Sequence, residues 1–241
     1  MSDFTNSTIF RGGRRVSRER LIAEPRWSHF TRKSHDVPSG YVELGELCRV
    51  HRGQVTGSNR IWIAGEHSAG LPDDVLFPTV TKARELFLPG LVLSDAESLR
   101  KVIDLPADLS DIPASKRDAV NAFLKRAEAM GAKANYTSQH RKAWWAVGLR
   151  DPAPILATYM ARRAPAFVLN KAGARHLNIA HGLYPRAPLS KDVSSALVKF
   201  LSGEPMMHRG RVYAGGLTKF EPREMERIPV PDPSMLAQMY A

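Results

Sequence analysis

Apolar residues in this chain recur mostly in short runs, and helix-like spacing is confined to a few segments. Residues 193–201 place Val193, Leu197, Phe200 and Leu201 on one face, which predicts an amphipathic helix. Residues 116–130 predict a second long helix, which Gly131 ends. Shorter helical segments are expected at 80–87, after a proline and a threonine, and at 221–227.

Strand-like apolar runs are more numerous than helices. They are short, rich in β-branched and aromatic residues, and bounded by glycine, proline and polar residues, which is typical of β-strands. They lie at 41–50, 61–63, 91–93, 144–149, 155–160, 166–169, 176–179 and 211–213. The sequence therefore predicts an α+β fold, a mixed β-sheet domain with short helices, and leaves the order of its strands open.

The first 35 residues differ from the remainder. They carry eight arginines and lysines and few apolar residues, so we expect a basic arm or partner-docking segment without its own core. Residues 36–241 form the main domain, with a possible break into two subdomains near 105–115.

Charge is unevenly distributed along the chain, and its distribution bears on what the protein binds. The chain of 241 residues has a formal net charge of +11, and residues 121–190 alone hold 11 lysines and arginines against two acidic residues. Residues 61–120 are acidic, with six cations against ten carboxylates. Basic blocks separated by an acidic block indicate a polarised surface of the kind that binds a polyanion, although a basic protein without such a surface is the simpler alternative.

Catalytic and cofactor motifs are missing from the sequence. It contains no Walker pattern, no nucleophile-elbow spacing and no histidine and cysteine spacing typical of zinc sites. The string Asp151-Pro152-Ala153-Pro154 lacks the adjacent prolines and aromatic residue of an Asn-Pro-Pro-aromatic loop. The sequence has no apolar run long enough to span a membrane. Its single cysteine, Cys48, cannot form an internal disulfide, so we expect a buried thiol in a protein of the reducing cytoplasm.

Several small polar or cationic segments could contact phosphates and base edges. Residues 52–60 form a loop with an arginine at each end and short donors between, although such a loop is also an ordinary solvated turn. Two adjacent tryptophans at 144 and 145 would point to opposite faces of a strand, one into the core and one beside Arg141 and Lys142. Lys219 follows Gly215-Gly216 in a hinge flanked by Arg211 and Arg223. The candidate contacts are Arg52, Thr56, Ser58, Asn59, Lys82, Arg84, Arg141, Trp144 and Lys219.

The order of these segments resembles a known family. Arg-Gly-x-x-Thr-Gly-x-Asn (52–59), Lys-Ala-Arg-Glu-Leu (82–86), Arg-Lys-Ala-Trp-Trp (141–145) and Pro-Ala-Phe-Val-Leu-Asn (165–170) precede Gly-Gly-Leu-Thr-Lys-Phe-Glu-Pro-Arg-Glu (215–224). Over roughly residues 25–233 the series is similar to the C-terminal target-recognition region of N6-adenine DNA methyltransferases of the TaqI and Eco57I type. In that family the S-adenosylmethionine-binding domain and its Asn-Pro-Pro-aromatic loop precede this region, and this sequence contains neither.

The resemblance implies that the nine candidates contact double-stranded DNA. It also implies no cofactor in this chain, with S-adenosylmethionine and catalysis supplied by a separate methyltransferase catalytic subunit. Two alternatives stay open at this point. One is a self-contained DNA-modifying enzyme with an unrecognised site, and the other is a scaffold that contacts only protein, through its acidic block.

Overall fold

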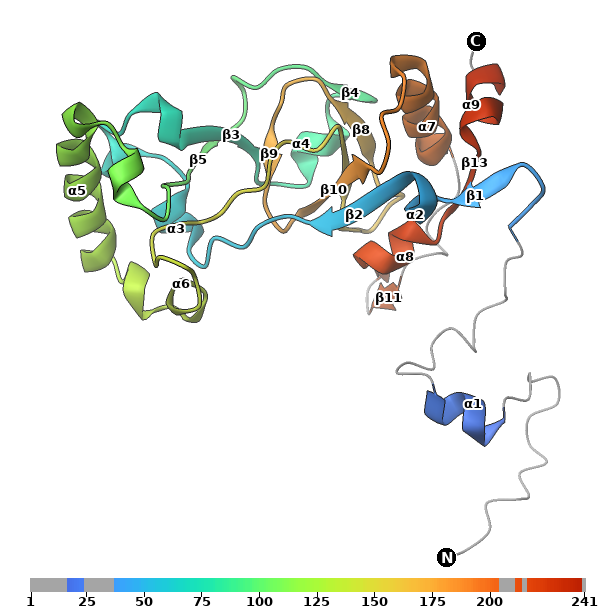
Figure 1. Cartoon of the computed structure of the whole chain (residues 1–241), viewed down its shortest axis with the longest axis horizontal. Helices are drawn as coiled ribbons and strands as arrows, with labels where there is room; N and C mark the ends of the chain where they lie inside the picture. The colour runs from blue at the N-terminus through green and yellow to red at the C-terminus, as the bar shows by residue number, and fades with distance from the viewer. Residues whose placement is uncertain (1–16, 24–36, 204–210, 214–215, 240–241) are drawn as a thin grey trace, which may run out of the picture. The chain divides into compact units, whose positions relative to one another are not determined.

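The computed structural model describes four ranges of the chain, residues 17–23, 37–203, 211–213 and 216–239. It separates two compact units, residues 1–38 and 39–241. The described part of the first unit contains helix α1 (Arg18–Ala23), and most of the predicted basic arm lies outside the described residues. The second unit combines several sheets with short helices, so the predicted α+β fold is confirmed (Figure 1).

A five-stranded sheet is the centre of the second unit. In spatial order its strands are β2 (Cys48–Arg52), β10 (Ala180–Pro185), β6 (Ile155–Thr158), β8 (Phe167–Asn170) and β4 (Val92–Leu93). The pairs are antiparallel except β4 with β8, which is parallel. Strands that begin at residues 48, 92, 155, 167 and 180 thus share one sheet, which no local pattern in the sequence could reveal.

Both faces of this sheet are buried. Successive residues of a strand point to opposite faces, so the clusters that they join show what covers each face. On β6, Ile155 and Ala157 join one apolar cluster while Leu156 joins another. Phe167 and Val168 on β8 divide between the same two clusters. The near-continuous apolar runs at 155–160 and 166–169 are therefore strands covered on both faces.

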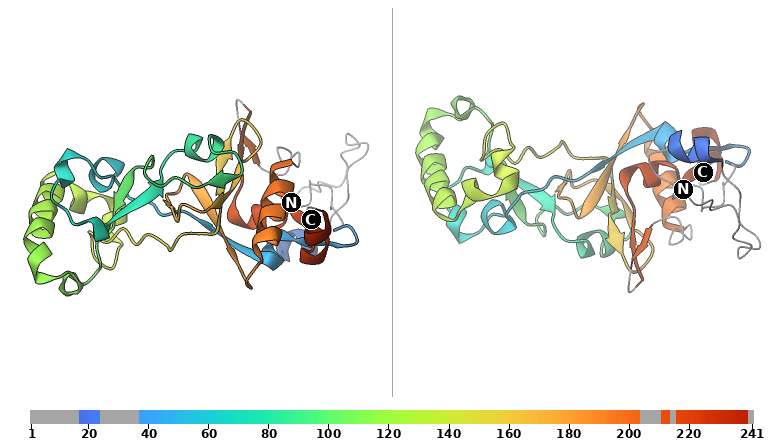
Figure 2. Two further views of the ribbon diagram at one scale, coloured as in Figure 1. Left: turned by 90° about the horizontal axis from the view of Figure 1, so that it is seen from above. Right: turned by 90° about the horizontal axis from the view of Figure 1, so that it is seen from below.

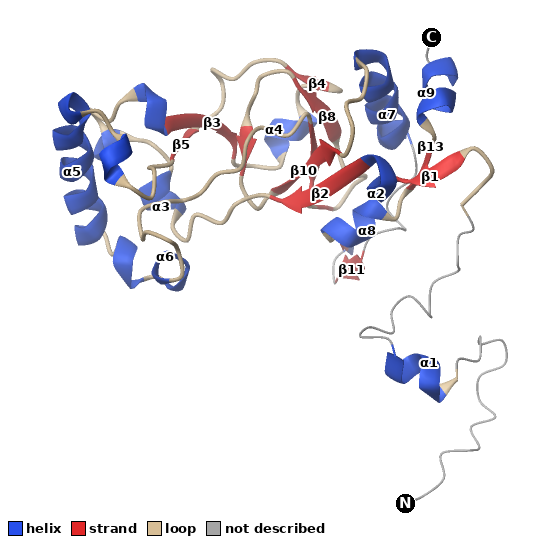
Figure 3. Cartoon of the chain, in the orientation of Figure 1, coloured by secondary structure: helices blue, strands red, loops and turns tan. Residues whose placement is uncertain are grey.

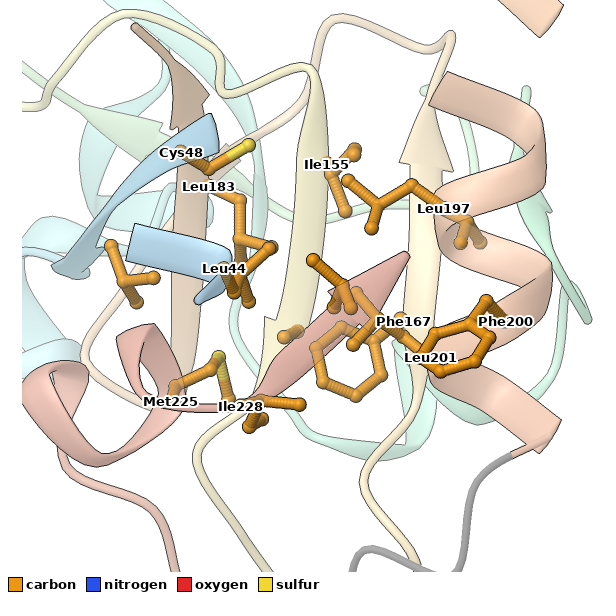
Figure 4. Packing of buried hydrophobic residues seen from close by; sticks show 14 of the residues in the cluster. Leu44, Cys48, Ile155, Phe167, Leu183, Leu197, Phe200, Leu201, Met225 and Ile228 are labelled. Atoms are coloured by element: carbon orange, nitrogen blue, oxygen red, sulfur yellow. The ribbon is translucent and has the colours of Figure 1, made fainter. Parts of the chain in front are cut away.

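Helix α7 (Lys191–Gly203) covers the first of these faces. Its apolar stripe carries Leu197, Phe200 and Leu201 into a core with Leu44, Ile155 and Phe167 (Figure 4). Helices α8 (Pro222–Glu226) and α9 (Pro233–Met239) contribute Met225 and Leu236 to the same cluster. The predicted helix over 193–201 is present, and it extends by a few residues at each end.

A separate apolar cluster lies around helix α5 (Ala114–Ala129), which confirms the helix predicted over 116–130, with slightly shifted ends. The cluster includes Trp62, Leu105, Ile112 and Phe123 and is flanked by a three-stranded sheet. That sheet has the order β5 (Lys101–Ile103), β3 (Leu76–Val80) and β9 (Arg175–His176). Within residues 39–241, α5 and α7 lie at opposite ends of the unit in both views of Figure 2.

Two further sheets complete the unit. Strand β1 (Tyr41–Glu43) pairs with β13 (Pro229–Pro231), and β12 (Leu217–Lys219) lies between β11 (Arg211–Tyr213) and β7 (Met160–Ala161). Lys219 was predicted to lie in a glycine hinge, and it instead ends a strand. Its position is fixed by pairing with Met160.

The predicted strand at 41–50 is interrupted, because α2 (Leu44–Leu47) separates β1 from β2. The Glu46 carboxylate accepts a hydrogen bond from the Glu43 backbone N–H, which caps this helical turn. The helix predicted over 80–87 is shorter, as α4 (Arg84–Phe87), and Val80 belongs to β3.

Two predicted strands, at 61–63 and 144–149, are wrong, and most of a third, at 176–179, is the connection between β9 and β10. Residues 61 and 62 belong to the helical turn α3 (Asn59–Trp62) (Figure 3). The prediction failed because a short apolar run does not by itself distinguish a strand from a buried helix. Residues 144–149 form no strand in the described structure. The N–H groups of Gly148 and Leu149 instead donate to the Asp104 carboxylate, at 2.8 and 2.7 Å.

Candidate nucleic-acid interface

Two predicted contacts far apart in the sequence meet at one aromatic ring. Arg52 ends β2, and its guanidinium carbon lies 4.7 Å from the centroid of the Tyr159 ring. Lys219 ends β12, and its Nζ lies 5.2 Å from the same centroid. Tyr159 is buried, so its ring serves as a fixed support that attracts both cations. We call Arg52, Tyr159 and Lys219 the Tyr159 cluster.

Lys219 is also paired with a carboxylate. Its Nζ lies 2.6 Å from Oε1 of Glu221. The hydrogen bond to Glu221, followed by that to Tyr159, raises the pKa of Lys219 above its usual range. The ammonium group is therefore charged throughout the physiological pH range, and Glu221 partly offsets its charge.

A buried histidine, His181, lies beneath the Tyr159 cluster, with its ring centroid 5.0 Å from that of Tyr159. His181, which pairs with Arg52 in the sheet, shares a 2.7 Å hydrogen bond between Nε2 and the Phe220 carbonyl oxygen. Burial, above all, lowers the pKa of His181 to about 4, and the same cause lowers the pKa of His176 to about 4. Both rings are neutral at pH 7, so the positive charge here comes from Arg52 and Lys219.

A pocket of about 550 Å³ lies beside β7 and α4. Among its lining residues are Arg84, Phe87, Met160, Arg162, Arg163 and Leu217. We call this the arginine pocket. One predicted contact, Arg84, lines the arginine pocket. A second, the exposed Lys82, lies in the turn before α4. Glu85 holds that turn, because its Oε2 accepts hydrogen bonds from the N–H groups of Thr81 and Lys82 at 2.7 and 3.0 Å.

Sequence reasoning missed Arg162, Arg163 and Tyr159. The signal for the arginines was present as an Arg-Arg pair inside the most basic window of the chain. Tyr159 carried no such signal, because only the fold brings it under residues 52 and 219. The pairing of Met160 with Lys219 places the arginine pocket next to the Tyr159 cluster.

The remaining candidates lie in a different region, near α3 and α6 (Tyr136–Gln139). Thr56 is buried, and its hydroxyl lies 2.6 Å from Oδ1 of Asn59. This contact gives Thr56 a role in shaping the loop instead of an exposed surface. Ser58 is half-buried and its carbonyl oxygen accepts from the N–H groups of Ile61 and Trp62, whereas Asn59 is exposed.

Arg141 and Trp144 are both partly buried. The Nη2 of Arg141 donates a 2.9 Å hydrogen bond to the Val55 carbonyl oxygen, and its guanidinium carbon lies 5.8 Å from the Trp62 ring centroid. Burial lowers the pKa of Arg141. Trp144 packs against Trp62, and the cation above its ring is Lys133, at 5.3 Å, not Arg141 or Lys142.

The structure thus divides the nine candidates into two groups. Arg52, Lys82, Arg84 and Lys219 lie beside the five-stranded sheet and β7, and the other five lie around α3 and α6. Within the described ranges no group of three or more His, Cys, Asp or Glu side chains is placed to hold a metal ion. None of the helices in those ranges is both long and apolar enough to cross a membrane.

Comparison with known proteins gives these features a context. Residues 31–240 match the family model of the C-terminal domain of the type II methyltransferase M.Eco57I. The chain is 54% identical over 231 residues to the type II methyltransferase M.XamI of Xanthomonas campestris pv. amaranthicola, covering 96% of this chain and 44% of that protein. It is 21% identical over 216 residues to the type II methyltransferase M.AccI of Acinetobacter calcoaceticus, covering 86% of this chain and 40% of that protein.

A solved structure shares the fold. The type IIG restriction endonuclease BpuSI superposes with a TM-score of 0.55 at 12% identity, over 84% of this chain and 26% of that chain. The chain therefore spans less than half the length of the curated relatives it matches. The family resemblance drawn from the order of the sequence motifs is confirmed.

Proposed function

Because this chain belongs to the family of the C-terminal domain of the type II methyltransferase M.Eco57I, we propose that it binds double-stranded DNA as the target-recognition part of an N6-adenine DNA methyltransferase. S-adenosylmethionine and the methyl-transfer centre lie outside these residues, on a methyltransferase catalytic part. The main structural support is the meeting of Arg52 and Lys219 over the Tyr159 ring.

Binding to the phosphates of a DNA backbone requires several cations on one surface, and the fold groups four of them. Arg52, Arg84, Arg163 and Lys219 come from four separate segments, and each is exposed or half-buried. Each phosphate that such a cation neutralises releases counterions from the DNA, and this release favours binding most at low salt. The Tyr159 cluster and the arginine pocket together supply the sequence-independent part of the affinity.

Base recognition falls to the second group. Gly57 in the loop before α3, and Asn59 and Arg60 in the first turn of α3, are exposed. Oδ1 of Asn59 is engaged by Thr56, which fixes the amide and leaves its nitrogen as a donor for acceptors on base edges. In this arrangement the cations near the sheet contact the DNA phosphates and position the protein, and the residues near α3 contact the bases and select the sequence.

The test is a fluorescence-anisotropy titration of this chain with a labelled duplex at several salt concentrations. The logarithm of the affinity should fall linearly with the logarithm of the salt concentration, with a slope of about −0.9 for each phosphate contacted. Arg52→Ala and Lys219→Ala should each make the slope shallower by about one phosphate. Lys125→Ala, which changes an exposed lysine on α5, is the matched control and should leave the slope unchanged.

A well-folded chain that binds no duplex, or binds it independently of salt, would refute the proposal. Equal effects of Lys125→Ala and Lys219→Ala would show that the Tyr159 cluster is not the contact. Calorimetry with S-adenosylmethionine separately tests the division of labour, since tight binding of the cofactor to this chain would contradict it.

A further inference from the structure

The arginine pocket combines positive charge with an apolar surface. Its volume of about 550 Å³ falls within the usual range of small-molecule sites, about 300–1,000 Å³. Arg84, Arg162 and Arg163 are exposed, whereas the apolar lining residues Phe87 and Leu217 are half-buried. A pocket of this composition suits a ligand that is anionic at one end and flat and apolar at the other.

Arg163 and Phe87 form a stacked pair at this pocket. The guanidinium carbon of Arg163 lies 3.5 Å from the centroid of the Phe87 ring. This is van der Waals contact, so the guanidinium packs against the face of the ring, as arginine does when it stacks on an aromatic side chain. An exposed guanidinium fixed in this way offers its other face to a second planar group. Nucleobases stack on arginine planes in this manner.

Two of the pocket's arginines, Arg84 and Arg163, have no carboxylate partner among the described residues. Glu85, adjacent to Arg84 in sequence, is engaged by the backbone N–H groups of Thr81 and Lys82. An anionic group entering the pocket would therefore meet uncompensated cations.

From this geometry we propose that the arginine pocket binds a single nucleotide whose base lies outside a helical stack. The base stacks on the guanidinium of Arg163, backed by Phe87, and the phosphate contacts Arg84 and the adjoining cations. The inference rests on the proposed function, because the nucleotide belongs to a DNA strand held by the same surface. Lys219 lies opposite Met160 of the pocket lining, so a strand contacting the Tyr159 cluster continues into the pocket.

The experiment compares three DNA probes that share one sequence. The first is a blunt duplex, the second carries one bulged nucleotide, and the third carries a single-nucleotide 3′ overhang. Anisotropy titrations of the full chain should show about 5- to 100-fold tighter binding to at least one probe with an unpaired nucleotide than to the blunt duplex. The bulge and the overhang tell whether the nucleotide comes from within a duplex or from its end.

Arg163→Lys keeps the charge and removes the flat stacking surface. In this variant the ratio of the affinity for the preferred unpaired-nucleotide probe to the affinity for the blunt duplex should fall to about one. Phe87→Leu, which keeps an apolar side chain but removes the aromatic backing, should weaken the preference in the same way. Circular dichroism and a thermal melt confirm that both variants are folded.

Equal affinity of the wild-type chain for all three probes would overturn the inference, and so would a preference that survives Arg163→Lys. In either case the blunt duplex still reports on the proposed function, so the two ideas fail separately. Absence of binding to every probe would remove both.

Discussion

Arg141 and Val55 are joined by a 2.9 Å hydrogen bond from the guanidinium Nη2 to the carbonyl oxygen, across 86 residues of chain. The bond ties the loop before α3 to the segment after α6. The bond gives Arg141 a part in holding this loop. A direct contact between Arg141 and DNA stays a prediction.

Arg141→Ala should lower the free energy of unfolding by no more than about 1.5–3 kcal/mol, the usual net value of a hydrogen bond to a charged group. The loss is limited because Nε and Nη1 of Arg141 are buried without partners in the described structure, and burying them costs free energy. Arg141→Met should lose less stability than Arg141→Ala, since it keeps the packing against Trp62 without a buried charge. Urea denaturation checks both, with the exposed neighbour Lys142→Ala as the control. If Arg141→Met proves the more destabilising variant, the charge itself is needed in the fold.

Acid should destabilise the second unit before it protonates most carboxylates. Burial lowers the pKa of His176 and of His181 to about 4 in the folded chain, against about 6.5 for an ordinary histidine. Because the unfolded state then binds more protons, their contribution is complete above pH 6.5 and is lost as the pH falls toward 4. Each could account for up to about 3 kcal/mol. Unfolding free energies measured between pH 7.5 and 4.5 should fall, and His176→Leu should flatten that decline. A curve of unchanged steepness in the variant would exclude His176 as the cause.

Gly53 is required by a close backbone approach. A Cβ added there would lie 2.1 Å from the Leu177 carbonyl oxygen and 2.7 Å from the His176 ring. Gly53→Ala should therefore cost more than about 3 kcal/mol, because backbone atoms cannot move aside cheaply. Gly203→Ala, at the end of α7 with open space around it, is the matched control and should be neutral or slightly stabilising. Comparable melting temperatures for the two variants would contradict the close approach.

Glu221 should restrain DNA binding by the Tyr159 cluster. Glu221→Gln removes the carboxylate that lies 2.6 Å from the Lys219 ammonium group. The affinity for a duplex at low salt should rise roughly two- to tenfold, since the net positive charge facing the backbone increases. In the Lys219→Ala background the same change should have a smaller effect. Equal gains in both backgrounds would show that Glu221 acts independently of Lys219.

The sequence predicted the elements that depend on local pattern. The amphipathic stripe of 193–201 and the strands at 155–160 and 166–169 needed only the spacing of apolar residues. It failed at 61–63, where three apolar residues fit a strand and a helical turn equally well. It failed again at 144–149, where the Asp104 side chain takes the N–H groups that a strand would give to a neighbour.

The candidate interface was predictable in composition but not in arrangement. Arg52 and Lys219 were identified as cations next to small residues, yet their meeting over Tyr159 depends on the pairing of β2, β10 and β12 with distant strands. Arg163 was overlooked because its partner Phe87 lies 76 positions earlier in the chain. Thr56 was identified by its hydroxyl, and only the structure shows that Asn59 occupies it.

The pairing of β1 with β13, Tyr41 opposite Pro231, has a consequence for how the molecule is made. The ribosome synthesises residue 41 long before residue 231, so β1 cannot pair with β13 until synthesis of these residues is nearly complete. Such distant closures make folding slow. An unfinished polypeptide that has not reached β12 carries Arg52 without Lys219, so the Tyr159 cluster forms only in the last stage of the synthesis of these residues.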